Sequence, residues 1–473
     1  MKTLHPRSLL AVVMLVGALL VQHPAAAGPT DALAGRKVLF VMAGDGPHRA
    51  TDDTIRRYLA SLGSTVAVVD LRHAAANAKG HDLVLVSSTV DGHEGAVALR
   101  DVAVPLISCE SRILHDLGMT LGMEGLDFGT TETPDTYLSI VNAPHPLAAG
   151  LAAGTFVATN ASVPMNWGRP GPAASVIAVP PGYPDRAAIF AYERGATLAN
   201  GTPAPARRVA CFFHDETFDK LEVRPEGRLA QGLPLFAAAL RWAVASPASV
   251  TASPPAAANG KRALLVTIRK SMHAKAEVRE AVARSNEGIQ KHLESLGFAV
   301  TMAGNEDDPA SMADGHDIVV IAATIRANRM LGRYKHVTIP VVNLENDILD
   351  DMSMTPKRRH VDFGEVEGRT FSIVNAAHPL AAAASETVQA FRSDTAVGFG
   401  RPGRGASIIA TVPGDPDKAV YFAYEKGATM DYDFLAPARR VYFPIDFDSF
   451  DRLTDSGLSL FDAALFWAME RPR

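Results

Sequence analysis

The residues with the clearest potential for chemistry are a glutamate, a histidine and an aspartate that follow predicted strands. Glu110 comes directly after the apolar segment 105–109, and His214 and Asp215 come after the apolar segment 208–213. A carboxylate or an imidazole in such a position can accept a proton from water or from a substrate hydroxyl. If the chain is an enzyme, Glu110, His214 and Asp215 are therefore its predicted catalytic residues, in a hydrolytic reaction.

Further polar and aromatic residues lie at predicted strand ends or in nearby loops, where they could contact a ligand. The predicted binding residues are Asp45, Ser88, Glu345, Asn346, Tyr192, Tyr424, Trp167 and Arg169. An aromatic ring beside an arginine in a Gly- and Pro-rich loop could stack on a ligand. Structural roles remain open as alternatives, because a glutamate can cap a helix N-terminus and an aromatic ring can anchor a turn.

The strand ends that carry these residues belong to a pattern of buried strands that alternate with helices. Segments 37–42 and 262–267 are continuous apolar strands, and helices at 53–62 and 276–296 follow them. Strands that are apolar on both faces are typical of a parallel sheet covered by helices on each side, and such sheets bind ligands at the carboxyl ends of their strands. Later segments at 175–179 and 187–191 predict a hairpin. The predicted fold class is α/β, with two tandem, doubly wound, flavodoxin-like domains and mainly parallel sheets.

The chain contains two copies of one long unit, as phrases that recur almost unchanged show. Ile-Val-Asn-Ala-Pro-His-Pro-Leu at 140–147 returns as Ile-Val-Asn-Ala-Ala-His-Pro-Leu at 373–380, and Ala-Arg-Arg-Val also recurs. A unit of roughly 210 residues is a whole domain, because solenoid repeats recur every 20–50 residues. The predicted domains are 35–245 and 260–471, joined by a Pro-, Ala- and Ser-rich linker at 246–259.

Together, the strand order, the His-Pro-Leu phrase and the Ala-Arg-Arg-Val strand resemble class I glutamine amidotransferase-like domains, and among these the ThuA-like, trehalose-utilisation type. In that family one strand ends in an elbow that carries a nucleophilic cysteine. Counting from Pro105 and Pro340 places Glu110 and Glu345 at the two elbows. Cys109 lies one residue early, and a one-residue slip on a strand points a side chain to the other face. Because glutaminase chemistry needs a thiolate and a histidine base, neither copy is predicted to be a glutaminase.

Other residues that suggest chemistry have structural explanations that we favour. His145 and His378 recur in one phrase, but the proline and apolar residues after them favour a turn held by imidazole hydrogen bonds. The two cysteines, Cys109 and Cys211, have apolar counterparts in the second copy, which favours buried thiols over a disulfide. The aspartates at 446–451 lack the spacing of an EF-hand, so neither a metal site nor a cofactor is predicted.

Composition and the N-terminus restrict the partners and the location of the protein. The net charge of −5 provides no basic surface for nucleic acid. Lys2 and Arg7, an apolar stretch and three alanines at 25–27 are typical of a secretory signal peptide at 1–27, cleaved near Ala27. The predicted location is therefore periplasmic or extracellular, without membrane contact after cleavage.

Three functions remain open from the sequence. The first is a non-catalytic binding or interaction module for a small molecule or, as the ThuA-like resemblance implies, for a carbohydrate. The second is a hydrolase or sugar-active enzyme that uses Glu110, His214 and Asp215. The third is a structural scaffold in which the two copies pack as an intramolecular pseudo-dimer. The missing nucleophiles favour the first, and the sequence leaves the oligomeric state undefined.

Overall fold

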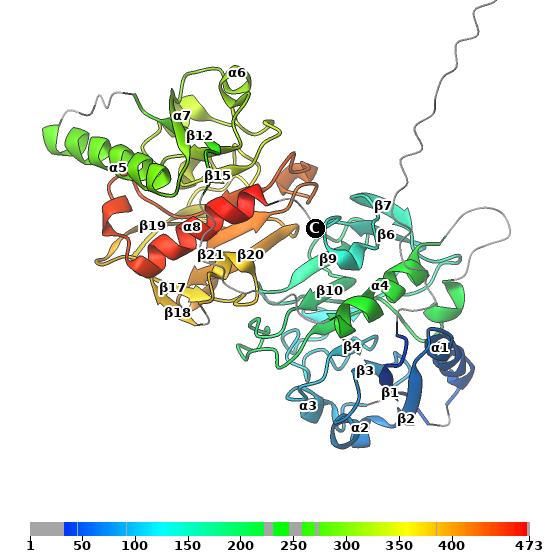
Figure 1. The fold of residues 1–473 in the computed structure, drawn as a ribbon. Helices are drawn as coiled ribbons and strands as arrows, with labels where there is room; N and C mark the ends of the chain where they lie inside the picture. The colour runs from blue at the N-terminus through cyan, green and yellow to red at the C-terminus, as the bar shows by residue number, and fades with distance from the viewer. Residues whose placement is uncertain are drawn as a thin grey trace, which may run out of the picture.

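The fold is that of a computed structural model, which describes residues 33–44, 46–90, 92–221, 230–245, 258–269, 273, 275–384 and 386–470. Three predicted features lie outside the described residues: the signal peptide at 1–27, the ligand contact Asp45 and most of the linker at 246–259. The described chain forms two α/β units, each built on its own large sheet (Figure 1). Within these residues, no helix is both long and apolar enough to span a membrane.

The first sheet combines a parallel half with an antiparallel half. Its parallel strands lie in the order β2-β1-β3-β4-β11 and are β1 (Lys37–Val41), β2 (Thr65–Val69), β3 (Leu83–Val86), β4 (Leu106–Ser108) and β11 (Arg208–Ala210). The antiparallel strands continue as β10 (Ile189–Tyr192), β9 (Ser175–Val179), β6 (Tyr137–Ile140) and β7 (Gly154–Val157). The order of the parallel strands is that of flavodoxin-like folds. The hairpin predicted from the sequence is confirmed, because β9 pairs with β10.

Helices cover both faces of this sheet, as the apolar pattern of its strands requires. The helices of the first domain are α1 (Arg49–Ser61), α2 (Leu71–Asn77), α3 (Ala96–Leu99) and α4 (Gly232–Val244). Successive side chains of a strand point to opposite faces. Accordingly Phe40 of β1 packs in a cluster with residues of α1 and α4, whereas Val41 packs with residues of α2 and α3.

The second domain repeats the strand order of the first. Its main sheet contains β13 (Ala299–Gly304), β12 (Arg262–Thr267), β14 (Ile318–Ile321), β15 (Val341–Asn343), β22 (Arg440–Tyr442), β21 (Asp415–Tyr424), β20 (Ala406–Val412), β17 (Thr370–Ile373) and β18 (Thr387–Gln389), in that order. Its helices are α5 (Ala276–Ser295), α6 (Pro309–Ala313), α7 (Ala327–Met330) and α8 (Asp455–Met469). The predicted fold class of two tandem α/β domains is confirmed.

Each domain carries one further pair of antiparallel strands. In the first domain the pair is β5 (Phe128–Thr130) and β8 (Asn166–Gly168), and Gly168 bridges to Ala187 just before β10. In the second domain the counterparts are β16 (Phe363–Gly368) and β19 (Thr395–Gly400), and Gly400 bridges to Ala419 of β21. The attachment of this pair to the main sheet is therefore the same in both domains.

The Ala-Arg-Arg-Val phrase builds the same two anchors in both domains. Arg207 forms a bidentate ion pair with Glu193, lies over the ring of Trp242 at 4.4 Å, and donates to carbonyls at the end of α4. The equivalent residues of the second domain make the same contacts. Arg208 and Arg440 are buried and donate to main-chain carbonyls before β4 and β15. Folding alone therefore accounts for this repeated phrase.

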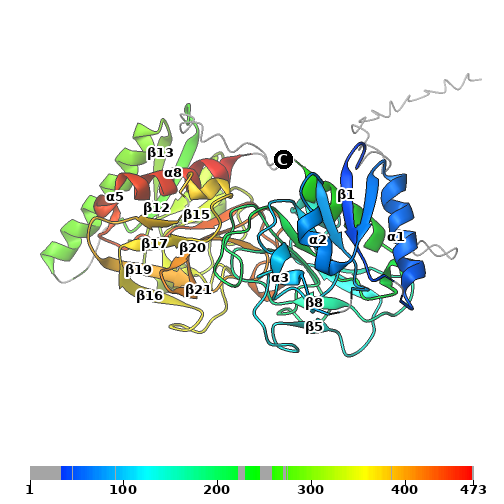
Figure 2. The same ribbon diagram turned by 90° about the horizontal axis from the view of Figure 1, so that it is seen from below.

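The two domains contact each other through equivalent segments. The Thr197 N–H donates to the Val374 carbonyl at 2.8 Å, and the equivalent Thr429 N–H donates to the Val141 carbonyl at 3.1 Å. Val374 also belongs to an apolar cluster of the first domain. Reciprocal contacts between like segments are the pattern of an isologous interface between two copies. Figure 2 shows the two domains side by side.

Cys109 and Cys211 are both buried free thiols. They follow the adjacent parallel strands β4 and β11, and the Cys211 N–H donates to the Ser108 carbonyl at 2.9 Å. Burial and the neighbouring Cys211 thiol raise the pKa of Cys109 well above its ordinary value. The prediction of buried thiols is confirmed, and Cys109 does not have the environment of a reactive nucleophile.

Candidate functional site

Glu110 lies at the elbow after β4, and its side chain is buried. Its Oε1 atom accepts a hydrogen bond from the main-chain N–H of Arg112 at 2.8 Å and another from the Arg112 Nε at 3.2 Å. Burial raises the pKa of Glu110, while the hydrogen bonds and charge of Arg112 oppose that rise. The carboxylate therefore holds the turn after β4 and has a cation beside it.

The space beside the Glu110 carboxylate is narrow. A shallow hollow lies there, and it has no room for a water molecule. Strand residues and the start of the elbow turn line it, including Ser108, Ser111, Asn166, Trp167 and Cys211. The neighbouring side chains therefore fill most of the space on this side of Glu110.

Asp215 pairs with a histidine, but with His48 rather than with its neighbour His214. The His48 Nε2 lies 3.6 Å from the Asp215 Oδ2, and His48 is the residue that precedes α1. His214 donates its main-chain N–H to the Thr217 hydroxyl at 2.9 Å. Among the described residues, no hydrogen bond or ion pair joins the His214 side chain to Glu110 or Asp215. The charge of Asp215 adds a little to the rise in the pKa of Glu110 that burial causes.

A buried carboxylate on α1 extends this polar region toward β3. Asp52 accepts hydrogen bonds from the Ser87 hydroxyl at 2.6 Å and the Thr89 hydroxyl at 2.7 Å. Burial raises the pKa of Asp52, and these two hydrogen bonds oppose the rise. In the second domain the Thr324 hydroxyl donates to the Asn286 amide oxygen at 2.6 Å instead. Both domains therefore have a hydrogen bond from this threonine to the first helix, but only the first domain has a carboxylate as the acceptor.

The second elbow keeps the glutamate but reverses the charge beside it. The Glu345 Oε1 accepts from the main-chain N–H of Asp347 at 2.8 Å, where the first domain has Arg112. Burial, followed by the charges of Asp347 and nearby carboxylates, raises the pKa of Glu345 to about 8. The Asn346 amide, with its nitrogen toward the carboxylates, donates to Glu345 and Glu365 at 3.2 Å each. Its surroundings therefore favour the protonated form of Glu345 more strongly than those of Glu110 do.

The predicted ligand tyrosines are fully buried and have their hydroxyl groups in use. The Tyr192 hydroxyl donates to the Met119 carbonyl at 2.9 Å and accepts from the Gly171 N–H at 2.7 Å. Tyr424 makes the equivalent pair of hydrogen bonds in the second domain. Burial raises the pKa of both tyrosines. Each tyrosine hydroxyl therefore links the main chain of two loops, those at Met119 and Gly171 or those at Met354 and Gly403.

The remaining predicted ligand residues of the first domain also have partners within the fold. Trp167 is 2% exposed, and the Arg186 guanidinium lies 4.6 Å from its ring centroid, so almost none of its surface is open to a ligand. Arg169 forms an ion pair with Asp185. Ser88 is buried near the end of β3. The sequence showed that residue 167 is aromatic but did not show whether its ring would face the core or the solvent.

His145 and His378 each cap a short helical turn. The Nδ1 atom of His145 accepts from the Leu147 N–H at 3.2 Å, and His378 makes the same contact with Leu380. Burial lowers the pKa of His145 to about 4 and that of His378 to about 3. Both imidazoles are therefore neutral at physiological pH and hold the loop that follows β6 or β17.

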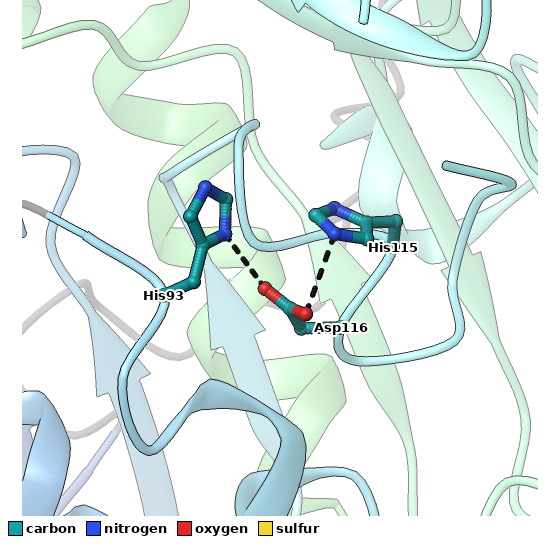
Figure 3. A group of neighbouring side chains, drawn as sticks. All are labelled: His93, His115 and Asp116. Atoms are coloured by element: carbon teal, nitrogen blue, oxygen red, sulfur yellow. Dashed lines mark hydrogen bonds and ion pairs between the residues drawn. The ribbon is translucent and has the colours of Figure 1, made fainter. Parts of the chain in front are cut away.

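A group of residues that could hold a metal ion lies at the same edge of the first sheet (Figure 3). His93 follows β3, and His115 and Asp116 follow β4. The Asp116 carboxylate lies 2.8 Å from the His93 Nδ1 and 3.3 Å from the His115 Nε2. One ligand atom from each residue lies within 4.8 Å of the others. None of the three was predicted from the sequence; the only available signal was that each follows a predicted strand.

Comparisons with known proteins leave the activity open. No protein-family model and no curated protein matches the chain. A Bacteroides uniformis ATCC 8492 protein described as ThuA-like is 12% identical, with a TM-score of 0.29, over 47% of this chain and 95% of its own. A Thermoplasma acidophilum protein described as part of a GMP synthase is 14% identical, with a TM-score of 0.28, over 43% of this chain and 92% of its own. Neither likeness assigns an activity to this chain.

Proposed function

We propose that the protein is a secreted, non-catalytic binding protein made of two amidotransferase-like domains, and that the first domain receives a small-molecule or carbohydrate ligand. The observation that carries the proposal is the use of both elbow glutamates. Glu110 and Glu345 each accept the main-chain N–H two residues further on, at 2.8 Å. A carboxylate used as a turn cap in place of a thiolate supports binding rather than acyl transfer.

The first domain is the better candidate for the ligand because its strand ends combine a partly exposed histidine–aspartate pair with a buried carboxylate. His48 and Asp215 pair at 3.6 Å, each with 30% of its side chain exposed. Asp52 lies below them, and the position of Asp52 is taken by the neutral Asn286 in the second domain. Polar groups at the carboxyl ends of parallel strands are the usual contacts of ligands in open α/β sheets.

Ligand binding is tested by thermal unfolding of the full chain with a panel of sugars and small metabolites. A ligand at about 100 times its Kd stabilises a protein by about 2.7 kcal/mol, which raises the Tm of a domain of this size by about 5–10 °C. Asp215→Asn is expected to abolish the increase. Asp53→Asn is the matched control, because Asp53 lies nearby on α1 and pairs with solvent-exposed arginines.

Enzyme activity is tested with the same proteins. The sugar-active alternative rests on one observation, the pairing of Asp215 with His48 at 3.6 Å. Release of sugar from glycosides that is lost in Glu110→Gln and Asp215→Asn would contradict the non-catalytic proposal. Ammonia release from glutamine would contradict it as well. If neither turnover nor a stabilising ligand is found, the scaffold alternative replaces the binding proposal.

A further inference from the structure

We propose that His93, His115 and Asp116 of the first domain form a binding site for one divalent transition-metal ion, of which zinc is the best fit. The site is separate from the elbow glutamate and from the His48–Asp215 pair. Its ligands come from the loops that follow β3 and β4, two adjacent strands of the parallel sheet. The site therefore lies where open α/β sheets bind ligands.

The chemistry of the three side chains fits a zinc-class ion. Two imidazoles and one carboxylate are ligands that zinc and similar ions accept, with metal–ligand distances of about 2.0–2.2 Å. Tetrahedral ligands at those distances lie about 3.3 Å apart. The His93 Nδ1 lies 2.8 Å from one carboxylate oxygen of Asp116 and the His115 Nε2 lies 3.3 Å from the other, and one ligand atom from each residue lies within 4.8 Å of the others, so small side-chain movements would bring the three ligands to that spacing. With three ligands, one position remains for water or for an anionic group of a ligand.

The site combines fixed ligands with an adaptable one. Only 11% of the Asp116 side chain is exposed, and its main-chain carbonyl accepts from the Arg100 Nε at 2.8 Å. The His115 ring stacks on Phe128, with ring centroids 5.2 Å apart and an interplanar angle of 8°. His93 has 53% of its side chain exposed, so it can adjust its position around an ion.

Asp116 has a charge that the surrounding residues do not neutralise fully. Within the described part of the chain, its carboxylate forms ion pairs with His93 and His115 alone, and these imidazoles are charged only when protonated. A nearly buried carboxylate without a permanent cation is stabilised when a metal ion binds. Figure 3 shows both rings directed toward this one carboxylate.

The second domain lacks the same set of ligands, and so it provides an internal comparison. Thr89 and Glu110 correspond to Thr324 and Glu345 of the second domain. Counted from these pairs, the positions of His93, His115 and Asp116 are taken by Asn328, Asp350 and Asp351. The two histidines are therefore not needed to form the shared fold.

One feature limits the affinity: the His115 Nδ1 is buried without a partner among the described residues. When the Nε2 binds a metal, that buried N–H lacks an acceptor, which costs about 10–100-fold in affinity. We therefore expect a micromolar Kd.

The experiment is a titration of the metal-free full chain, without a polyhistidine tag, with zinc chloride in a calorimeter. The wild-type chain is expected to bind one zinc ion. His93→Ala, His115→Ala and Asp116→Asn are expected to weaken binding at least 100-fold, because even loss of an outer-shell partner costs 10–100-fold. Cobalt in place of zinc should give the visible absorption of a tetrahedral nitrogen and oxygen site, and the variants should lose it.

The matched control is His73→Ala. His73 contacts Asp70 through its Nδ1 at 2.8 Å on the surface of the same domain, so it tests whether any exposed His–Asp pair binds zinc. Its substitution should leave the zinc affinity unchanged. The proposal is overturned if the wild-type chain binds less than half an equivalent of zinc at 100 µM, or if His93→Ala binds as tightly as wild type. Because His93 is exposed, that variant decides the question even if Asp116→Asn fails to fold.

Discussion

Substitution of Gly398 by asparagine is expected to destabilise the second domain through a clash with Tyr442. A Cβ atom at Gly398 would lie 2.0 Å from the Tyr442 hydroxyl oxygen and 2.8 Å from the Asn346 Cβ. Gly398 lies inside strand β19 and has no positive φ, so the backbone itself accepts a side chain. The backbone therefore adds no strain, and the cost comes from overpacking, typically about 1–3 kcal/mol, together with burial of the new amide.

The first domain shows the opposite solution to the same packing problem. There Asn166 takes the position of Gly398, and Ala210 takes the position of Tyr442. The Asn166 Nδ2 donates to the carbonyls of Cys109 and Phe213. One domain thus fills the space with an asparagine from the side strand, and the other fills it with a tyrosine from the main sheet.

This exchange makes the two positions thermodynamically coupled. Tyr442→Ala alone should cost about 3–5 kcal/mol, as large-to-small changes at buried aromatic residues do. If the effects were additive, the double variant Gly398→Asn/Tyr442→Ala would lose about 4–8 kcal/mol. We expect it to lose less than Tyr442→Ala alone, because the asparagine fills the vacated space. The coupling energy should therefore exceed the cost of Gly398→Asn alone, which is about 1–3 kcal/mol.

The assay is hydrogen exchange of peptides from β19 and β22 across a urea series, which reports the unfolding free energy of the second domain by itself. Gly368→Asn is the matched control, since a Cβ at Gly368 meets nothing within 4 Å. Additivity of the two single effects within about 0.5 kcal/mol would refute the reasoning. So would a Gly398→Asn variant as stable as the control.

Three further predictions concern buried polar groups. Arg440→Met should destabilise the second domain by about 3–5 kcal/mol, because several main-chain carbonyls lose their hydrogen-bond donor. Urea denaturation measures this loss, and an unchanged midpoint would contradict the prediction. Cys109 and Cys211 should react with an aromatic disulfide reagent only as the first domain unfolds, so rapid labelling of the native chain would show that they are not buried thiols. Glu345→Gln should gain stability over wild type as pH rises from about 4.5 to about 8, by on the order of 4 kcal/mol, because the folded state keeps the Glu345 proton that the unfolded state loses. A pH-independent difference would disprove the raised pKa.

Much of the fold could be predicted from the sequence because its signals are local. Apolar runs such as 37–42 indicate strands, and glycines at helix ends indicate where helices stop. The duplicated phrases indicate two copies. None of these signals requires knowledge of tertiary contacts. Counting from Pro105 also placed Glu110 at the end of a strand, where the structure has it. The phrase around His145 likewise indicated a turn, because the proline after it restricts the backbone.

The environment of the candidate site was decided only by the tertiary structure. Asp215 contacts His48 from the start of α1, not His214, because strand order rather than sequence proximity determines which loops meet at a sheet edge. Arg112 and Asp347 give the two elbow glutamates opposite neighbours, and their effect on the pKa depends on burial, which no local pattern encodes. His93 and Asp116 come together for the same reason: β3 and β4 are adjacent and parallel, so the loops after them share one edge.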